Sequence, residues 1–289
     1  MKHSMNRTQL KYLAVLAMIV DHIGVFLLSA YAPGTGAAAG IAGGGIAGMT
    51  ALYVICRVFG RLTAPFMCFF LAEGFQKTSS YRKYVLRLLA FAVISQAPYA
   101  LAHHGAAILE AGISGASVLS MYLIPDINML ATLLISFLVL LAYEHFRFSP
   151  LRWVLIILLV LASIPCDWGV FCPLFVLCFH IFRADRRKQL RSFAIVAAIL
   201  VGLNIGFLAS KGSPWYAELW QLGMFAFIPL IGLYDGTLGV AKAPKPAAPS
   251  ASGAEAGPLS AFAGKWFFYI IYPAHLLVFF LIRLGLGTL

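Results

Sequence analysis

Long hydrophobic runs are the feature that most restricts how this chain can fold. Stretches of roughly 15–22 apolar residues, such as LAVLAMIVDHIGVFLL, recur along most of the sequence. In a bilayer every backbone N–H and C=O group must be satisfied within the protein, so only helices and closed barrels span it. The runs lack the alternation of short outer-membrane strands. The sequence therefore predicts an all-α, polytopic integral membrane helical bundle.

The composition supports this class, because 62% of the 289 residues are hydrophobic and the mean hydropathy is +0.90. Soluble domains are about 45–50% apolar. We expect one transmembrane domain, residues 1–289, with about nine helices. Gly60 and Pro65 predict a kink in the second helix, and PCDWG predicts a tight hairpin between the fifth and sixth. The expected spans are approximately 10–29, 50–76, 84–102, 127–144, 152–165, 169–182, 190–209, 215–234 and 265–284.

Basic residues predict the orientation. The formal net charge is +11, and most of the 21 Lys and Arg residues lie in short groups between alternate hydrophobic runs. Such grouping is typical of cytoplasmic loops rather than of nucleic-acid binding, so we expect no nucleic-acid partner. The prediction is a multi-pass protein of the cell inner membrane with a cytoplasmic N-terminus and membrane lipid around it.

Two segments of low complexity interrupt the hydrophobic pattern. Residues 32–49 are rich in Gly and Ala, and we expect them to form an outside loop. Residues 241–258 are rich in Ala and Pro, which predicts a flexible cytoplasmic linker. No internal repeat is visible, although repeats are usual in secondary transporters.

Ionisable side chains inside the spans are candidate functional groups, because each costs about 2.5–3.5 kcal/mol on insertion. Asp21 and His22 lie about 15 Å along the first helix, and His275 lies at a similar depth along the last. Two histidines from opposite ends of the chain are thus predicted to share a polar chamber, where an imidazole can move a proton near neutral pH. The alternative is a structural polar pair that fixes helix packing.

Other polar residues allow a functional and a structural interpretation. Arg57 and Arg61 share one helix face, which is typical of an anion clamp. They can equally extend toward the membrane surface or pair with Asp126 or Asp167. Glu73 can pair with Lys77, four residues later. His180 is expected at the membrane interface, whereas His103, His104 and His145 are expected in loops. No HExxH or CxxC motif indicates a metal site.

Several segments resemble the TraX family in sequence and order. They are LAMIVDHIG, ICRVFGRLTAPFMCFFLAEGFQKT, RKYVLRLLAFAVISQAPY, NMLATLLIS, DWG, IPLIGLYDG and KWFFYIIYPAHLL. The family is named for a conjugative-plasmid protein associated with N-terminal acetylation of F-type pilin. TraX proteins are distantly similar to multi-spanning acyltransferases that carry an early helical histidine and a late Y-x-x-H histidine. His22 and Tyr272–His275 correspond to these positions.

The resemblance implies a membrane acetyltransferase. Acetyl-CoA would be the donor, and the acceptor would be a pilin amine or a surface polysaccharide at or across the membrane. The implied catalytic residues are His22, Asp21 and His275. Candidate substrate- or anion-binding residues are Arg57, Arg61, Glu73, Gln96, Asn128, Asp167 and Tyr272.

Two other functions stay open at the level of sequence. A proton-coupled permease also uses buried Asp and His side chains. A non-catalytic membrane assembly protein would need these residues for stability alone.

Overall fold

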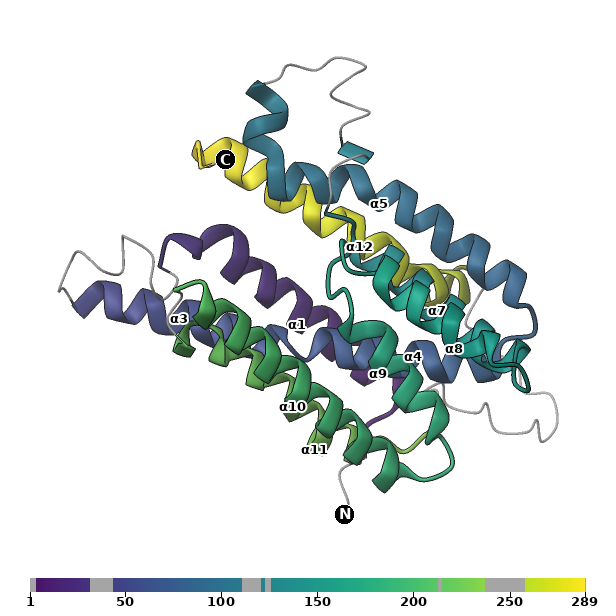
Figure 1. Cartoon of the computed structure of the whole chain (residues 1–289). Helices are drawn as coiled ribbons and strands as arrows, with labels where there is room; N and C mark the ends of the chain where they lie inside the picture. The colour runs from purple at the N-terminus through teal and green to yellow at the C-terminus, as the bar shows by residue number, and fades with distance from the viewer. Residues whose placement is uncertain are drawn as a thin grey trace, which may run out of the picture.

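The computed structural model describes residues 4–31, 44–110, 121–122, 126–212, 215–236 and 258–288, and these form a helical bundle (Figure 1). In this part of the chain the backbone is helical apart from turns and two isolated bridges. The elements are α1 (Arg7–Leu27), η1 (Ser29–Tyr31), α3 (Gly44–Gly60), α4 (Thr63–Lys77), α5 (Tyr81–Glu110), α7 (Met129–His145), α8 (Leu151–Ala162), α9 (Phe171–Ile181), α10 (Arg186–Ser210), η2 (Trp215–Ala226), α11 (Phe227–Gly232) and α12 (Pro258–Leu286).

Apolar side chains cover the outside of the bundle as well as its core. Along α10, exposed large apolar residues follow one another at intervals of four, which places them on one face of the helix; they are Ile195, Ile199, Leu203 and Phe207. A water-exposed helix would carry polar residues on such a face. The pattern agrees with a multi-pass membrane protein whose outer surface contacts lipid.

Helix α4 forms the centre of the core. It packs against α1, α7 and α9, and most of its side chains are buried. Its phenylalanines form edge-to-face contacts with neighbouring rings: Phe66 lies 5.0 Å from Phe227, and Phe69 lies 5.7 Å from Phe179, between ring centroids. Aromatic rings favour this geometry, so the Phe-rich sequence of α4 links several helices at once.

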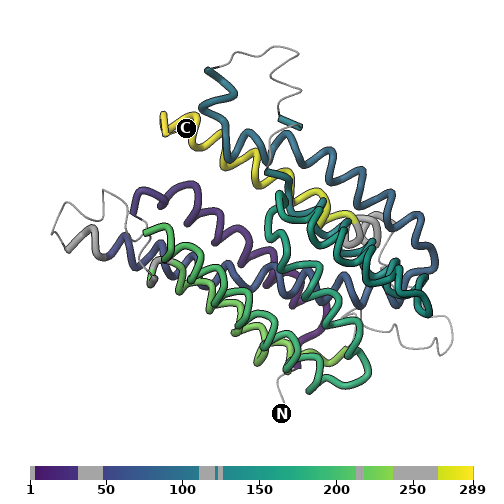
Figure 2. Tube along the Cα trace, in the orientation of Figure 1, coloured from purple at the N-terminus to yellow at the C-terminus, as the bar shows by residue number. Residues whose placement is uncertain are grey.

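The first and last helices meet inside the bundle, although the two termini lie apart (Figure 1). Helix α12 packs along α5 and also contacts α1 (Figure 2). The Tyr272 hydroxyl accepts a hydrogen bond from the Met129 backbone N–H at 3.1 Å, which joins α12 to the start of α7. The C-terminal helix is thereby placed beside residues from the first twenty-odd positions of the chain.

The predicted kink near Gly60 and Pro65 is observed as a break. Helix α3 ends at Gly60 and α4 begins at Thr63, with Arg61 and Leu62 in a turn between them. Pro65 lies in the first turn of α4, where its missing N–H costs no helical hydrogen bond. The break lets residues before and after it face the same interior space.

Two expected segments differ from the structure, and a third cannot be compared with it. Helix α3 begins at Gly44, inside the segment 32–49 that we expected to be a loop. Residues 215–234 form a 3₁₀ helix, η2, followed by the short α11, rather than one long α-helix. Segment 241–258 lies outside the described residues except for its last position.

The expected hairpin of the fifth and sixth helices is wrong in its packing. Helices α8 and α9 do follow one another across the turn at PCDWG, but α8 packs on α7, whereas α9 packs on α4, α7 and α10. Within the described residues, five helical segments are long and apolar enough to cross a membrane: Arg7–Leu27, Gly48–Lys77, Tyr81–Glu110, Arg186–Ser210 and Trp266–Leu286. The number of nine spans and the cytoplasmic N-terminus stay predictions.

A glycine substitution tests the packing of η2 on α3. A Cβ atom added at Gly223 would lie 2.1 Å from the Val58 carbonyl oxygen, so Gly223→Ala must push the two elements apart. We expect a fall of several degrees in the melting temperature of the purified protein, measured by tryptophan fluorescence. Gly202→Ala on α10 is the control, since nothing lies within 4 Å of the added atom. Equal melting temperatures for the two variants would contradict the close approach.

Candidate functional site

A polar cavity of about 200 Å³ lies inside the bundle, and we call it the histidine cavity. Its walls come from α1, the break between α3 and α4, α5, the start of α7, α12 and the turn at 167–168. Six candidate residues from the sequence analysis form part of its wall: Asp21, His22, Arg57, Arg61, Asp167 and Tyr272. These residues are spread over 252 positions of the chain, and folding brings them to one space.

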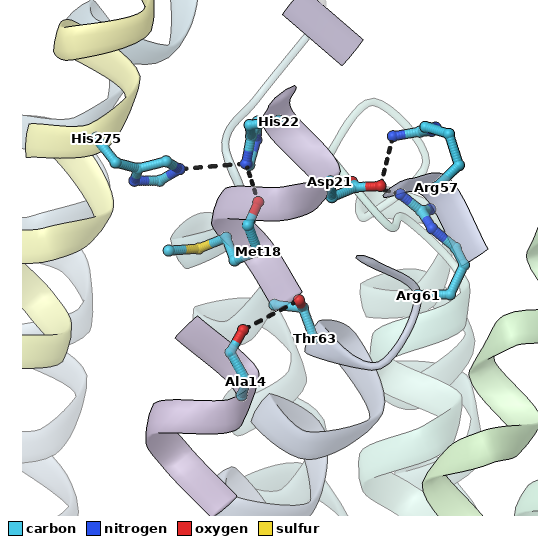
Figure 3. Close-up of polar contacts among 8 residues, drawn as sticks. All are labelled: Ala14, Met18, Asp21, His22, Arg57, Arg61, Thr63 and His275. Carbon is cyan, nitrogen blue, oxygen red and sulfur yellow. Dashed lines mark hydrogen bonds and ion pairs between the residues drawn. The ribbon is translucent and has the colours of Figure 1, made fainter. Parts of the chain in front are cut away.

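His22 and His275 contact each other beside this cavity (Figure 3). The distance from His275 Nε2 to His22 Nδ1 is 3.2 Å, and the ring centroids are 4.7 Å apart. His22 also stacks on Phe26 at 5.4 Å between centroids. The expectation that the first and last helices bring their histidines together is thus met by the geometry.

The neighbouring carbonyl groups determine where each imidazole carries its proton. His22 Nδ1 lies 2.8 Å from the Met18 carbonyl oxygen, and His275 Nδ1 lies 2.8 Å from the Ile271 carbonyl oxygen. A carbonyl only accepts, so we assign the proton of each neutral ring to Nδ1. The single Nδ1–H of His22 is then shared between two acceptors, the Met18 carbonyl oxygen and His275 Nε2. No hydrogen bond to His22 Nε2 is formed within the described part of the chain, so its lone pair is free to take a proton.

Asp21 faces away from His22 and binds two arginines instead (Figure 3). Its Oδ1 accepts from Arg57 Nη1 at 2.7 Å, and its Oδ2 accepts from Arg61 Nη2 at 2.6 Å. The approach requires a glycine, because a Cβ atom at Gly60 would lie 2.3 Å from the Asp21 side chain. The arginines therefore pair with an aspartate that the sequence analysis did not assign to them.

Two tryptophans complete the arginine site, and sequence reasoning missed both. The Arg57 guanidinium lies 4.3 Å from the centre of the Trp220 ring, and Arg61 lies 4.5 Å from Trp168 and 4.6 Å from Trp220. Cation–π contacts of this kind stabilise a cation away from water. Trp168 could have been suspected from its place next to Asp167 in the DWG motif. Trp220 carries no signal in the sequence.

Asp167 and Tyr272 also face the histidine cavity. The backbone around Asp167 is fixed by its N–H, which donates to the Ile127 carbonyl oxygen at 2.7 Å, and by the Thr132 hydroxyl, which donates to the Asp167 carbonyl oxygen at 2.6 Å. His103 lines the cavity as well, although we expected it in a loop; it lies on α5, which continues to Glu110.

Gln96 and Asn128 form a structural network away from the cavity lining. Asn128 is the N-cap of α7: its Oδ1 accepts from the Leu130 and Ala131 N–H groups, and its Nδ2 donates to Gln96 Oε1 at 2.8 Å. Gln96 Nε2 donates to two backbone carbonyl oxygens. With their polar atoms used in this way, both side chains hold α5 to α7.

Glu73 and His180 lie outside the histidine cavity. Glu73 accepts from Lys77 Nζ at 2.5 Å, as its spacing indicated, and from the Tyr234 hydroxyl at 3.0 Å. The His180 side chain is buried within the protein, and its Nε2 lies 2.6 Å from Glu144 Oε1; its place at the membrane interface stays a prediction. In the described part of the chain, no three His, Cys, Asp or Glu side chains are grouped closely enough to hold a metal ion.

Comparison with known proteins identifies the family. A model described as "TraX protein" matches residues 6–283. The chain belongs to the TraX family. It is also 28% identical over 270 residues to a protein of Dichelobacter nodosus named "Probable fimbrial assembly protein FimC, serogroup H1", with 93% of this chain and 91% of that one covered. No solved structure matches. The resemblance seen in the sequence motifs is confirmed, and it extends over nearly the whole TraX chain.

Removing the carboxylate of Asp21 tests the arginine site. Asp21→Asn leaves two buried guanidinium groups without the anion they contact, and breaking a buried ion pair costs about 3–5 kcal/mol. We expect a clear fall in the melting temperature of the purified protein. The double variant Asp21→Asn/Arg57→Gln should lose less stability than the two single changes together, because one unpaired cation is gone.

Asp185→Asn is the matched control for this change. Asp185 is the exposed N-cap of α10, and asparagine caps a helix equally well. The melting temperature of the Asp185→Asn variant should stay close to that of the parent protein. Additive effects of the Asp21 and Arg57 changes would show that the ion pair does not stabilise the bundle.

Proposed function

We propose that this TraX protein is a membrane acetyltransferase of the cell inner membrane. It moves an acetyl group from acetyl-CoA to an amine or hydroxyl group of an acceptor. The observation that carries the proposal is the His22–His275 pair, which faces a polar cavity inside a lipid-exposed bundle. Buried imidazoles with one free lone pair are suited to general-base catalysis near neutral pH.

In the proposed reaction His22 Nε2 takes the proton of the acceptor group. The acceptor nitrogen or oxygen attacks the thioester carbonyl carbon and forms the new C–N or C–O bond. The C–S bond then breaks, and the proton on His22 passes to the departing thiolate to give free CoA. His275 Nε2 accepts from His22 Nδ1–H, so it stabilises the imidazolium that forms between these two steps.

The arginine site supports the same chemistry. Arg57 and Arg61 place two guanidinium groups on the cavity wall, where they share the Asp21 carboxylate; a second carboxylate, that of Asp167, also lines the cavity. Attack on a thioester places negative charge on the carbonyl oxygen, and fixed cations in a site of low dielectric stabilise such an oxyanion. Asp21 keeps the two arginines in place, since it touches both and lies on the other side of α1 from His275.

A pilin is the acceptor that relatives favour. The Dichelobacter nodosus protein is named for fimbrial assembly, and the resemblance of the sequence motifs to the TraX family implies acetylation of a pilin. An N-terminal amine of a membrane-held subunit would reach a cavity inside the bilayer more readily than a soluble protein would. A surface polysaccharide hydroxyl is the second acceptor of matching chemistry.

Replacement of His22 tests the proposal directly. Purified protein in nanodiscs is given radiolabelled acetyl-CoA, with and without an envelope extract, and free CoA and labelled product are measured. The parent protein should release CoA only when an acceptor is present. Loss of a general base costs about 10²–10⁴-fold in rate, so His22→Ala should lose at least about 100-fold.

His145→Ala is the control, because His145 is exposed at the end of α7 and far in sequence from the cavity residues. It should keep the parent rate. Full acetylation by His22→Ala protein would overturn the proposed mechanism. Proton-dependent uptake into vesicles without any acyl donor would favour a permease instead.

A further inference from the structure

Three cavities follow one another along the same face of α1. The first, the mouth cavity, has a volume of about 90 Å³ and is lined by Arg7 and Lys11. The second, the middle cavity, has a volume of about 30 Å³ and is lined by Ala14 and Met18. The histidine cavity comes next. Residues three to four apart lie on one face of a helix, so this succession describes a path parallel to α1.

Shared wall residues show that the cavities adjoin. Met67 and Phe268 line both the mouth cavity and the middle cavity. Met18, Met129 and Tyr272 line both the middle cavity and the histidine cavity. The mouth and histidine cavities have no wall residue in common among those described, so the middle cavity is the link between them.

The mouth cavity combines cations with aromatic walls. Arg7 Nε lies 3.2 Å from Glu73 Oε2, but within the described residues no carboxylate lies within 4.0 Å of Lys11 Nζ. Lys11 Nζ instead lies 4.7 Å from the centre of the Phe268 ring. Arg87 adds a third cation, since its Nε donates to the hydroxyl of Tyr269, a wall residue. Such a group of cations is suited to phosphate.

The middle cavity is narrow and apolar. Its volume is enough for one or two water molecules, so an unbranched chain can fill it but a ring cannot pass without side-chain movement. Three of its wall residues are methionines, Met18, Met67 and Met129, whose flexible side chains adjust to the shape of an occupant.

The length of the path restricts the donor further. Lys11 and His22 are eleven residues apart on α1, which is roughly 16 Å along the helix. A ligand with phosphate at Lys11 must therefore carry its reactive group on a long arm. In acetyl phosphate the acyl group is bonded directly to the phosphate, so it cannot reach both ends. In a CoA thioester the acyl group lies at the end of a long arm. The part of that arm next to the thioester, the β-alanyl-cysteamine segment, is unbranched, and the branched pantoyl part lies beside the phosphates.

We propose that the three cavities form one donor conduit for a CoA thioester. Arg7 and Lys11 bind its phosphates at the mouth cavity, the middle cavity holds the unbranched part of the arm, and the thioester carbonyl reaches the histidine pair. This rests on the proposed transferase function and assigns positioning roles to Lys11 and Met67. The narrow middle cavity also favours a donor whose arm is unbranched in the part next to the thioester.

Binding and kinetics of two variants test the conduit. Lys11→Gln removes one phosphate contact, so KM for acetyl-CoA should rise about tenfold while kcat is kept. Lys83→Gln, on exposed α5 surface, should leave KM unchanged and so controls for general charge. Met67→Trp fills the middle cavity. It should reduce CoA affinity to that of adenosine 3′,5′-bisphosphate, which has phosphates but no arm.

Met67→Leu is the control of similar volume, and it should bind CoA as the parent does. Retained binding of the bisphosphate by Met67→Trp shows that this variant is folded. If the parent protein transfers acetyl groups but neither variant changes KM or CoA affinity, the proposed conduit is wrong and the proposed transferase function is kept. If the parent binds CoA, and Met67→Trp weakens that binding, but no acetyl group is transferred, the proposed conduit is kept and the transferase function is wrong. If Met67→Trp alters only co-purified phospholipid, measured by native mass spectrometry, the cavities hold lipid and the conduit is wrong.

Discussion

The contact of Asp21 with Arg57 and Arg61 is the interaction on which the arrangement of the site depends. In an apolar bundle an unpaired ion is costly, so these three charges can be buried only together. Their pairing brings α1 against the break between α3 and α4, where Gly60 allows the carboxylate to approach. Trp168 and Trp220 cover the guanidinium groups and connect the turn at 167–168 and η2 to the same centre.

The neighbouring residues Asp21 and His22 have separate tasks because a helix turns by about 100° per residue. Asp21 faces the arginines, whereas His22 faces α12 and meets His275. The ion pair therefore fixes the rotation of α1, and that rotation aims the imidazole at its partner. A change at either of the two positions affects the other through the orientation of one helix rather than through a hydrogen bond between them.

The sequence predicts the helical membrane class and the meeting of His22 with His275, because both follow from hydropathy and depth along a helix. It does not predict that Arg57 and Arg61 bind Asp21, since several acidic residues had suitable positions and only tertiary packing selects among them. Gln96 and Asn128 look like site residues in a hydrophobic span, yet they satisfy backbone groups at the start of α7. Hydrophobicity alone also cannot distinguish the 3₁₀ helix η2 from an α-helix, because both bury similar residues.

For the proposed acyl transfer, a polar cavity inside a membrane bundle must exclude lipid and still admit a charged donor and a separate acceptor. The path along α1 meets this requirement in a simple way. Its cationic end can hold a phosphate group, and its narrow apolar part excludes that group from the reaction centre. The charged part of a donor then stays at the end of the bundle, while only its uncharged thioester enters. The histidine cavity keeps its remaining volume for the acceptor, so the two substrates can approach the imidazole from different directions.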